Sequence, residues 1–265
     1  MSVTLNEVDL DVNGRSLVSG ITLEVDPGSL TALIGPNGAG KTTLIRLLAG
    51  DIPATRGTVK YGDELLDRIP IRRRARLRSV LPQIHTSATS FTVEQVVSMG
   101  RYTYRLDQDG DIGQDGRLVD EAIDSLDLGE LRSRQIRFLS GGELQRVAIA
   151  RVLAQQAPLV LLDEPTTALD IRHKESVMAL IEGLRPHGHT VVAVLHDLNM
   201  ATHFDQVMLL DEGAIVASGT PDDVLTSDVL SAVYSHPIDV VEHPTRPGLL
   251  VLPRGATPAN AGGSE

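Results

Sequence analysis

A glycine-rich segment that ends in lysine and threonine is the most distinctive chemical pattern in the sequence. Residues 35–42 read Gly-Pro-Asn-Gly-Ala-Gly-Lys-Thr, which is the spacing of loops that cradle phosphates. The glycines permit positive backbone φ, so successive N–H groups can converge on phosphate oxygens. Lys41 can contact the β- and γ-phosphates, and the Thr42 hydroxyl can bind Mg²⁺. The alternative is a glycine-rich turn with an incidental lysine. The residues predicted to bind nucleotide are Gly35, Pro36, Asn37, Gly38, Ala39, Gly40, Lys41, Thr42 and Thr43.

Two acidic residues and a histidine follow apolar runs further along the chain. Asp163 and Glu164 follow the run at 159–162, and His196 follows the run at 191–195. In open α/β sheets, ligands bind where strands end. Asp163 is therefore a candidate Mg²⁺ ligand, Glu164 a candidate to orient or deprotonate water, and His196 a candidate to hold that water. The alternatives are a solvated acidic turn and an ordinary packing or surface histidine.

The elements that must position these residues alternate along the chain. Period-two patterns at residues 3–5, 10–12 and 21–25, with a turn at Asn13-Gly14, predict an N-terminal antiparallel β ribbon. The apolar run at 30–34 leads into the glycine loop, and leucines then recur at helical spacing until Gly50. After Pro158, strands at 159–162, 190–195 and 207–210 alternate with helices at 173–184 and 198–204. Such alternation predicts an α/β fold with a mostly parallel sheet.

Between the two halves of that pattern the helical signal dominates, so we expect an inserted helical subdomain in a P-loop NTPase (nucleoside triphosphatase) core. The expected organisation is one domain over 2–235, with the α/β core at 2–85 and 155–235 and the insertion at 86–154. Residues 236–252 form a C-terminal extension. The small, polar segment at 253–265 is expected to be a disordered tail.

Composition narrows the possible functions. The 265 residues carry a net charge of −11, so clustered cations for general nucleic-acid binding are not expected. There is no cysteine, which excludes disulfides and thiolate chemistry. The aromatic residues are four Tyr, three Phe and no Trp, too few for base-stacking platforms. The N-terminus lacks a signal-peptide pattern and the apolar runs are short, which predicts a chain without membrane spans.

The segment at 139–145, Leu-Ser-Gly-Gly-Glu-Leu-Gln, adds a much more specific signal. It resembles the signature motif of ATP-binding-cassette (ABC) ATPases. The glycine loop, Leu81-Pro82-Gln83, the strand before Asp163, Ala168-Leu169-Asp170 and His196 occur in the family's order. The resemblance covers about residues 2–235 and implies an ATPase that uses ATP and Mg²⁺.

The resemblance also implies how two copies cooperate. In the family, a head-to-tail homodimer encloses ATP between the glycine loop of one protomer and the signature of the other. Ser140, Gly141 and Gly142 would contact that nucleotide, and Asp170 would lie along the seam. Gln83 would begin a loop that senses Mg²⁺, water and a membrane partner. A helix start with small residues is independently suited to an anion.

A narrower resemblance links the segments 81–102 and 168–175, and His-Asp-Leu-Asn-Met-Ala at 196–201, to ATPase subunits of bacterial importers for iron siderophores, haem and cobalamin. Haem-import subunits look most similar. This implies an integral-membrane permease dimer docked near residues 84–105, a substrate-binding protein acting through the permease, and a location at the cytoplasmic face of the cell membrane. The open alternatives are a siderophore or cobalamin importer, or a soluble cassette ATPase acting on nucleic acid or ribosomes. The single cassette, net charge and lack of cysteine disfavour the soluble class.

Two further features carry expectations. Val12 occupies the position where many family members place an aromatic ring near adenine, so we expect apolar contact there without ring stacking and a modest preference for ATP over GTP. An arginine run lies at 68–78. It could bind RNA or anionic lipid, but we favour a solvated helix face near the phosphate site.

Overall fold

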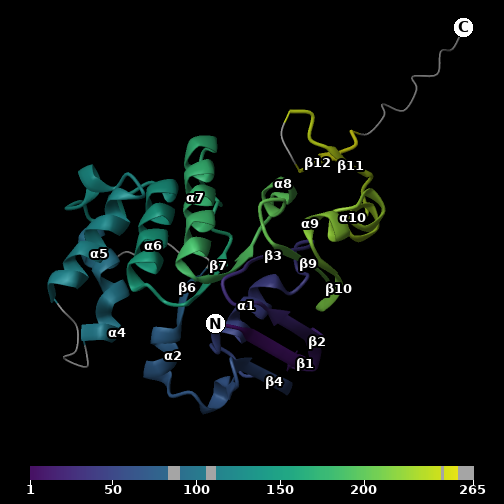
Figure 1. Cartoon of the computed structure of the whole chain (residues 1–265), viewed down its shortest axis with the longest axis horizontal. Helices are drawn as coiled ribbons and strands as arrows, with labels where there is room; N and C mark the ends of the chain where they lie inside the picture. The colour runs from purple at the N-terminus through teal and green to yellow at the C-terminus, as the bar shows by residue number, and fades with distance from the viewer. Residues whose placement is uncertain (83–89, 106–111, 246–247, 256–265) are drawn as a thin grey trace, which may run out of the picture.

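The computed structural model describes residues 1–82, 90–105, 112–245 and 248–255. In the view of Figure 1, the long helices lie above the left part of a central, mainly parallel sheet, the C-terminal elements lie above its right part, and an antiparallel sheet lies below it. The predicted fold class, including the N-terminal antiparallel ribbon and the helical insertion, is confirmed. Within the described ranges, no helix has both the length and the apolar character needed to cross a membrane.

The central sheet has six strands, and every neighbouring pair is parallel except β9 and β10. The spatial order of its strands is β10 (Ala214–Gly219), β9 (Gln206–Asp211), β3 (Leu30–Ile34), β8 (Thr190–Val194), β7 (Leu159–Asp163) and β6 (Arg78–Leu81). Strands β3, β7 and β8 are buried along their whole length. This explains their continuous apolar sequences, because both faces of a parallel sheet are covered.

Alternate residues of β7 enter different cores. Leu159 and Leu161 pack in the cluster that the central sheet forms with the antiparallel sheet and α1 (Lys41–Ala49), whereas Val160 and Leu162 pack against the helical side. This follows from the two-residue period of a strand. The sheet is therefore held rigidly from both faces, and it positions the residues that follow each strand.

The antiparallel sheet has the order β2 (Arg15–Val25), β1 (Val3–Val12), β4 (Arg56–Tyr61) and β5 (Glu64–Leu65). Asn13 and Gly14 both have positive φ, 51° and 76°, as the predicted two-residue turn requires. Helix α1 ends at Gly50, which is left-handed, and the Gly50 N–H bonds back to the last turn.

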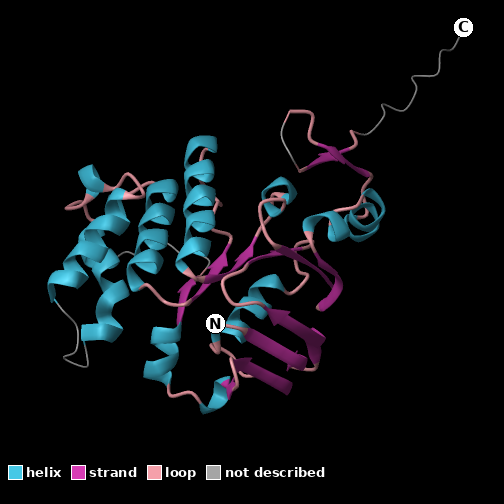
Figure 2. Ribbon diagram, viewed as in Figure 1, coloured by secondary structure: helices cyan, strands magenta, loops and turns pink. Residues whose placement is uncertain are grey.

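The helices between β6 and β7 form the predicted insertion (Figure 2). Arg101 and Asp115 form a buried ion pair of 2.7 Å there, and the Arg101 guanidinium also donates to the Ala154 and Gln155 carbonyls. The α-helices of this part and of the adjoining segments are α2 (Ile71–Leu77), α3 (Val93–Ser98), α4 (Tyr102–Arg105), α5 (Ile112–Asp124), α6 (Gly141–Gln155) and α7 (Ile171–Leu184). Short 3-10 helices occur at Leu66–Arg68, Met99–Arg101, Gly129–Leu131, Ile136–Phe138 and Arg185–His187.

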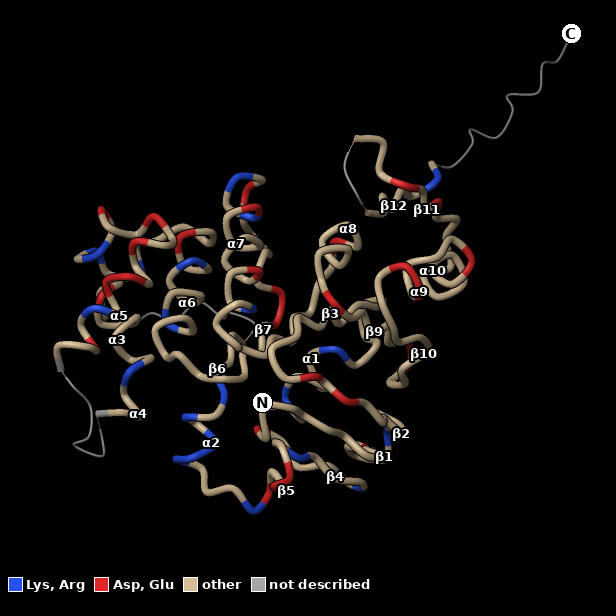
Figure 3. The backbone as a smooth tube through the Cα atoms, viewed as in Figure 1, with Lys and Arg blue, Asp and Glu red and all other residues tan. Residues whose placement is uncertain are grey.

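The arginine run forms α2 and its flanks, visible as blue segments in Figure 3. Helix α2 buries no residue, as expected of a solvated face. Several arginines nevertheless have structural roles, since Arg73 pairs with Glu64 at 2.9 Å and Arg74 donates to the Ile69 carbonyl. Some arginines of the run therefore stabilise neighbouring segments and are not part of a free cationic surface.

The C-terminal part contains more structure than the sequence predicts. It comprises α8 (Leu198–Ala201), α9 (Pro221–Val224), α10 (Ser227–Tyr234) and an antiparallel hairpin of β11 (Ile238–Glu242) and β12 (Leu249–Pro253). Helix α8 is shorter than the predicted helix at 198–204. The Asn199 side chain bonds both the N–H and the carbonyl of Val251, which attaches the hairpin to α8. Residues 256–265 of the predicted tail lie outside the described part of the chain.

Candidate nucleotide-binding site

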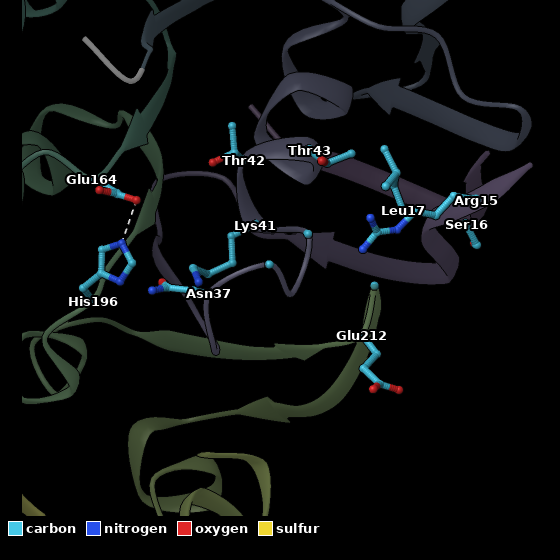
Figure 4. Close-up of a pocket in the computed structure, with 13 residues that line it drawn as sticks. Arg15, Ser16, Leu17, Asn37, Lys41, Thr42, Thr43, Glu164, His196 and Glu212 are labelled. Atoms are coloured by element: carbon cyan, nitrogen blue, oxygen red, sulfur yellow. Dashed lines mark ion pairs between the residues drawn. The ribbon is translucent and has the colours of Figure 1, made fainter. Parts of the chain in front are cut away.

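A pocket of about 430 Å³ opens between the central sheet, α1 and the tip of the β1–β2 ribbon (Figure 4). It brings together Asn37, Lys41 and Thr42 from the glycine loop with Glu164 and His196 from the ends of β7 and β8. The sequence separates these residues widely, but the parallel strand order β3, β8, β7 puts their carboxyl ends side by side. The residues lining the pocket are Arg15, Ser16, Leu17, Asn37, Gly38, Gly40, Lys41, Thr42, Thr43, Glu164, His196, Glu212 and Gly213.

The glycine loop has a backbone that only glycine allows at two points. Gly35 has φ 146°, and a Cβ there would lie 2.1 Å from the Leu210 carbonyl oxygen. Gly40 has φ 101°, and its Cβ would lie 2.9 Å from the Leu17 carbonyl oxygen. Gly40 is also the N-cap of α1 and provides no side-chain cap, so the first N–H groups of the helix remain available to an anion.

Lys41 is only 7% exposed and folds back over the loop. Its Nζ donates to the carbonyl oxygens of Gly35 at 2.7 Å and Pro36 at 2.8 Å. An ammonium has three donors, so one remains for a phosphate oxygen. Burial lowers the pKa of Lys41, while the nearby Glu164 and Asp163 carboxylates act in the opposite direction.

Asp163 lies at the end of β7 and is 3% exposed. Burial raises the pKa of Asp163 above its ordinary value, while the nearby Thr42 hydroxyl acts in the opposite direction. The Oδ1 atom is buried without a hydrogen-bond partner among the described residues. One unpartnered carboxylate oxygen beside a threonine hydroxyl fits Mg²⁺, which uses few protein oxygens and keeps substrate phosphates and water as its other ligands.

Glu164 and His196 form an ion pair or hydrogen bond across the pocket, with His196 Nε2 2.6 Å from Glu164 Oε1 (Figure 4). The Oε2 atom of Glu164 accepts from the Thr167 hydroxyl at 3.1 Å. Glu164 has φ 54°, an uncommon conformation for a residue other than glycine. The carboxylate is therefore oriented by contacts on both oxygens, while part of it, 17% of the side chain, stays accessible.

The signature segment forms a second, separate pocket of about 450 Å³. Its lining includes four predicted residues, Ser140, Gly141, Gly142 and Asp170, and no residue that lines the first pocket. Ser140 caps α6, accepting from the Glu143 N–H at 3.3 Å, and Glu143 accepts from the Ser140 N–H at 2.7 Å. That bond lowers the pKa of Glu143. The Asp170 carboxylate caps α7 in the same way, and its bonds to His173 lower its pKa.

Some predicted residues do not line the first pocket or lie outside the described part of the chain, and some lining residues were not predicted. Val12 is 44% exposed and does not line this pocket, although its strand partner Arg15 does, and its contact with adenine stays a prediction. Gln83 lies outside the described residues, as do residues 84–89 of the predicted permease-docking segment. Sequence reasoning missed five lining residues: Arg15, Ser16, Leu17, Glu212 and Gly213. The available signals were the Asn13-Gly14 turn and the Glu-Gly pair after the strand at 207–210, but neither reveals that the two turns meet.

A glycine-lysine loop between a parallel strand and a helix, with an acidic pair ending a strand of the same sheet, defines an ATP-binding ATPase of the phosphate-loop class. The family model for the ABC transporter matches residues 18–167, more than half of the chain. The chain belongs to the ABC transporter family, and it is an ATPase coupled to transport.

Two relatives are similar over most of their length. The hemin import ATP-binding protein HmuV of Rhodococcus jostii is 43% identical over 242 residues, covering 91% of this chain and 82% of the relative. The HmuV of Nocardia farcinica is 45% identical over 245 residues, with coverage of 90% and 83%.

Solved structures give the same fold. A chain of an inward-facing ABC transporter assigned to the metal-chelate type aligns with a TM-score of 0.80 and 26% identity over 96% of this chain and 97% of that one. A dimeric bacterial ABC transporter cassette, MJ0796, aligns with a TM-score of 0.76 and 25% identity over 83% and 98%.

Proposed function

We propose that this chain is the ATP-hydrolysing subunit of a bacterial importer that takes up an iron chelate, and that the chelate is haem. The relatives named as hemin import subunits, at 43% and 45% identity over about nine-tenths of the chain, carry the substrate proposal. The structural relative of the metal-chelate type supports import of a metal chelate in general, and a siderophore or cobalamin importer is the second candidate.

The separation of the two pockets supports a homodimer. The Lys41 pocket and the Ser140 pocket share no lining residue, although both present helix N-termini suited to phosphate. A head-to-tail pair would let Ser140 and Gly142 of one protomer close over the nucleotide held by Lys41 of the other. The dimeric form of the MJ0796 cassette is consistent with this arrangement. ATP would then favour the closed state because it binds that state better.

Hydrolysis would depend on residues of the first pocket. Mg²⁺, held by Thr42 and Asp163 together with the phosphates, would neutralise developing charge when bound. Glu164 would accept a proton from an attacking water at its carboxylate, and His196, whose Nε2 lies 2.6 Å from that carboxylate, would hold it in position. Lys41 would direct its remaining N–H at the γ-phosphate. Gln83 would add a contact to Mg²⁺ or water, and Asp170 would lie at the protomer seam.

The membrane partners follow from the same proposal. A permease dimer would hold two copies of this chain at the cytoplasmic face of the cell membrane, docking near residues 84–105, and a substrate-binding protein would deliver the cargo to that permease. This arrangement places no haem ligand on the ATPase itself, so the substrate is tested in the assembled transporter.

The experiment is to copurify the chain with its permease, reconstitute the complex in vesicles, and measure ATP hydrolysis with the binding protein loaded in turn with haem, a ferric siderophore and cobalamin. Haem should stimulate hydrolysis most strongly. Stimulation by a siderophore or cobalamin alone would replace haem with the second candidate. A chain that hydrolyses ATP but associates with no permease would contradict the transport proposal.

A further inference from the structure

Gln145 links the signature helix to the residue that bears the candidate general base. It lies on α6 and is 7% exposed. Its Nε2 donates to the backbone carbonyl oxygens of Glu164 at 3.1 Å and Pro165 at 3.0 Å. Both N–H donors of the amide are therefore spent on the turn that follows β7, and none of these contacts involves a pocket-lining side-chain atom.

The turn held by Gln145 needs support. Glu164 has φ 54°, and a residue before proline is normally pushed towards extended conformations. A left-handed conformation is unfavourable for a residue other than glycine, so the surroundings must stabilise it. The Glu164 carbonyl accepts from the Thr167 N–H at 3.2 Å as well as from Gln145. Gln145 also provides the donor for the Pro165 carbonyl, which would otherwise lose a buried hydrogen bond.

We propose that Gln145 is a positioning residue for hydrolysis: its amide fixes the backbone of Glu164 so that the carboxylate meets His196 at 2.6 Å. The inference rests on the proposed role of Glu164. Gln145 is not one of the residues that line the nucleotide pocket, and its hydrogen bond to Glu164 is made to the backbone carbonyl. Its loss should therefore change the rate of the chemical step and leave ATP binding in place.

Gln155 offers a matched control on the same helix. Its Nε2 also donates to two backbone carbonyls, those of Ala75 at 2.6 Å and Arg78 at 2.7 Å, but these lie at the α2–β6 junction. A Gln155→Leu variant removes the same chemistry from the same helix without touching the Glu164 turn. The variant therefore shows how much stability and activity are lost when a hydrogen-bonded amide away from Glu164 is removed.

The first measurement compares Gln145→Leu with Gln155→Leu. Because a misplacement of about 1 Å can cost 100-fold, we expect kcat of Gln145→Leu to fall about 10- to 100-fold. The KM for ATP should stay within about twofold, the pattern of an interaction that matters only in the transition state. Gln155→Leu should keep its kcat at a similar loss of thermal stability. Equal kcat in the two variants would overturn the proposal.

A second variant covers the case in which Gln145→Leu does not fold. In Gln145→Glu the new carboxyl faces two carbonyl oxygens in a buried place, so its pKa should be raised. Below that pKa its O–H can donate to one carbonyl, and above it the carboxylate repels both. The kcat of Gln145→Glu relative to the parent should therefore fall as pH rises from 6 to 9. A flat ratio would contradict positioning by the amide, because a purely structural role has no reason to titrate.

A Glu164→Gln variant tests the role of Glu164 separately from the positioning role of Gln145. If Glu164→Gln retains full turnover, the role of Glu164 is wrong and the role of Gln145 falls with it. If Glu164→Gln abolishes turnover while Gln145→Leu hydrolyses ATP at the parent rate, only the positioning role is refuted.

Discussion

The Nε2 atom of His196 lies 2.6 Å from the Oε1 atom of Glu164. Their strands are parallel neighbours, with Asp163 of β7 opposite Val194 of β8. Each residue follows its strand by one or two positions, so the strand register alone brings the two side chains to the same edge. The contact orients the Glu164 carboxylate in the pocket that the phosphate loop also lines.

Replacing Glu164 by glutamine should separate ATP binding from turnover. The amide keeps the size of the side chain but cannot accept a proton from water. We expect Glu164→Gln to bind ATP normally, to lose hydrolysis, and to accumulate as an ATP-bound dimer in light scattering. The control is Glu182→Gln. It breaks another glutamate–histidine pair, between Glu182 and His203 at 2.9 Å, and neither of these residues lines the nucleotide pocket. A Glu164→Gln protein that remains monomeric at saturating MgATP would contradict the enclosed-nucleotide dimer.

Removing the ammonium of Lys41 should remove nucleotide binding. The Lys41 ammonium hydrogen-bonds the Gly35 and Pro36 carbonyls within its own loop, so Lys41→Ala should remain folded by circular dichroism. Equilibrium titration with a fluorescent ATP analogue should show a loss of at least about 10-fold in affinity, as expected when a charge-assisted contact is deleted. Lys60→Ala, an exposed lysine on β4, should bind as the parent does. Unchanged hydrolysis in Lys41→Ala would refute the phosphate-loop assignment.

At neutral pH the buried Asp163 carboxylate should lower the free energy of unfolding. The same carboxylate should be needed to bind Mg²⁺. Burial raises its pKa in the folded state, so the folded chain holds this proton more tightly than the unfolded chain does. The contribution of Asp163 to stability therefore falls as pH rises from its ordinary value through the raised one. Asp163→Asn should show a higher Tm than the parent at pH 7 without nucleotide, and a smaller difference at pH 4.

The same variant should lose the effect of Mg²⁺. For the parent chain, adding Mg²⁺ to the ATP-bound protein should raise the Tm, because a ligand that binds only the folded state stabilises it. For Asp163→Asn that increment should largely disappear. A Mg²⁺ increment equal to that of the parent would place the metal on other groups.

A methyl group at Gly35 should disrupt the phosphate loop. The added Cβ would meet the Leu210 carbonyl oxygen at 2.1 Å, and the φ of 146° is unfavourable for alanine. We expect Gly35→Ala to lower the free energy of unfolding by about 2–4 kcal/mol and to weaken ATP binding, measured by denaturant titration and calorimetry. Gly116→Ala, in the exposed face of α5 with open space around it, should instead stabilise by about 1 kcal/mol. Comparable effects of the two changes would show that the clash is relieved cheaply.

Several parts of this protein can be predicted from short stretches of sequence. The glycine loop, the apolar runs at β3, β7 and β8, and the Asn13-Gly14 turn each specify their conformation through neighbours only a few residues away. The acidic pair at the end of β7 and His196 after β8 could be predicted for the same reason. The ordered motifs then identified the family, because each motif is short and continuous.

Other features depend on how segments far apart in the sequence pack against one another. The contribution of Arg15, Leu17 and Glu212 to the pocket depends on two turns from distant parts of the chain meeting at α1. The C-terminal hairpin and the Gln145 bonds are likewise invisible locally, because a strand pair or an amide–carbonyl contact has no sequence period of its own. Packing therefore determines which polar side chains orient Glu164 and which only stabilise the fold. The physical reason is that burial and hydrogen bonding between remote segments arise only once the chain has folded.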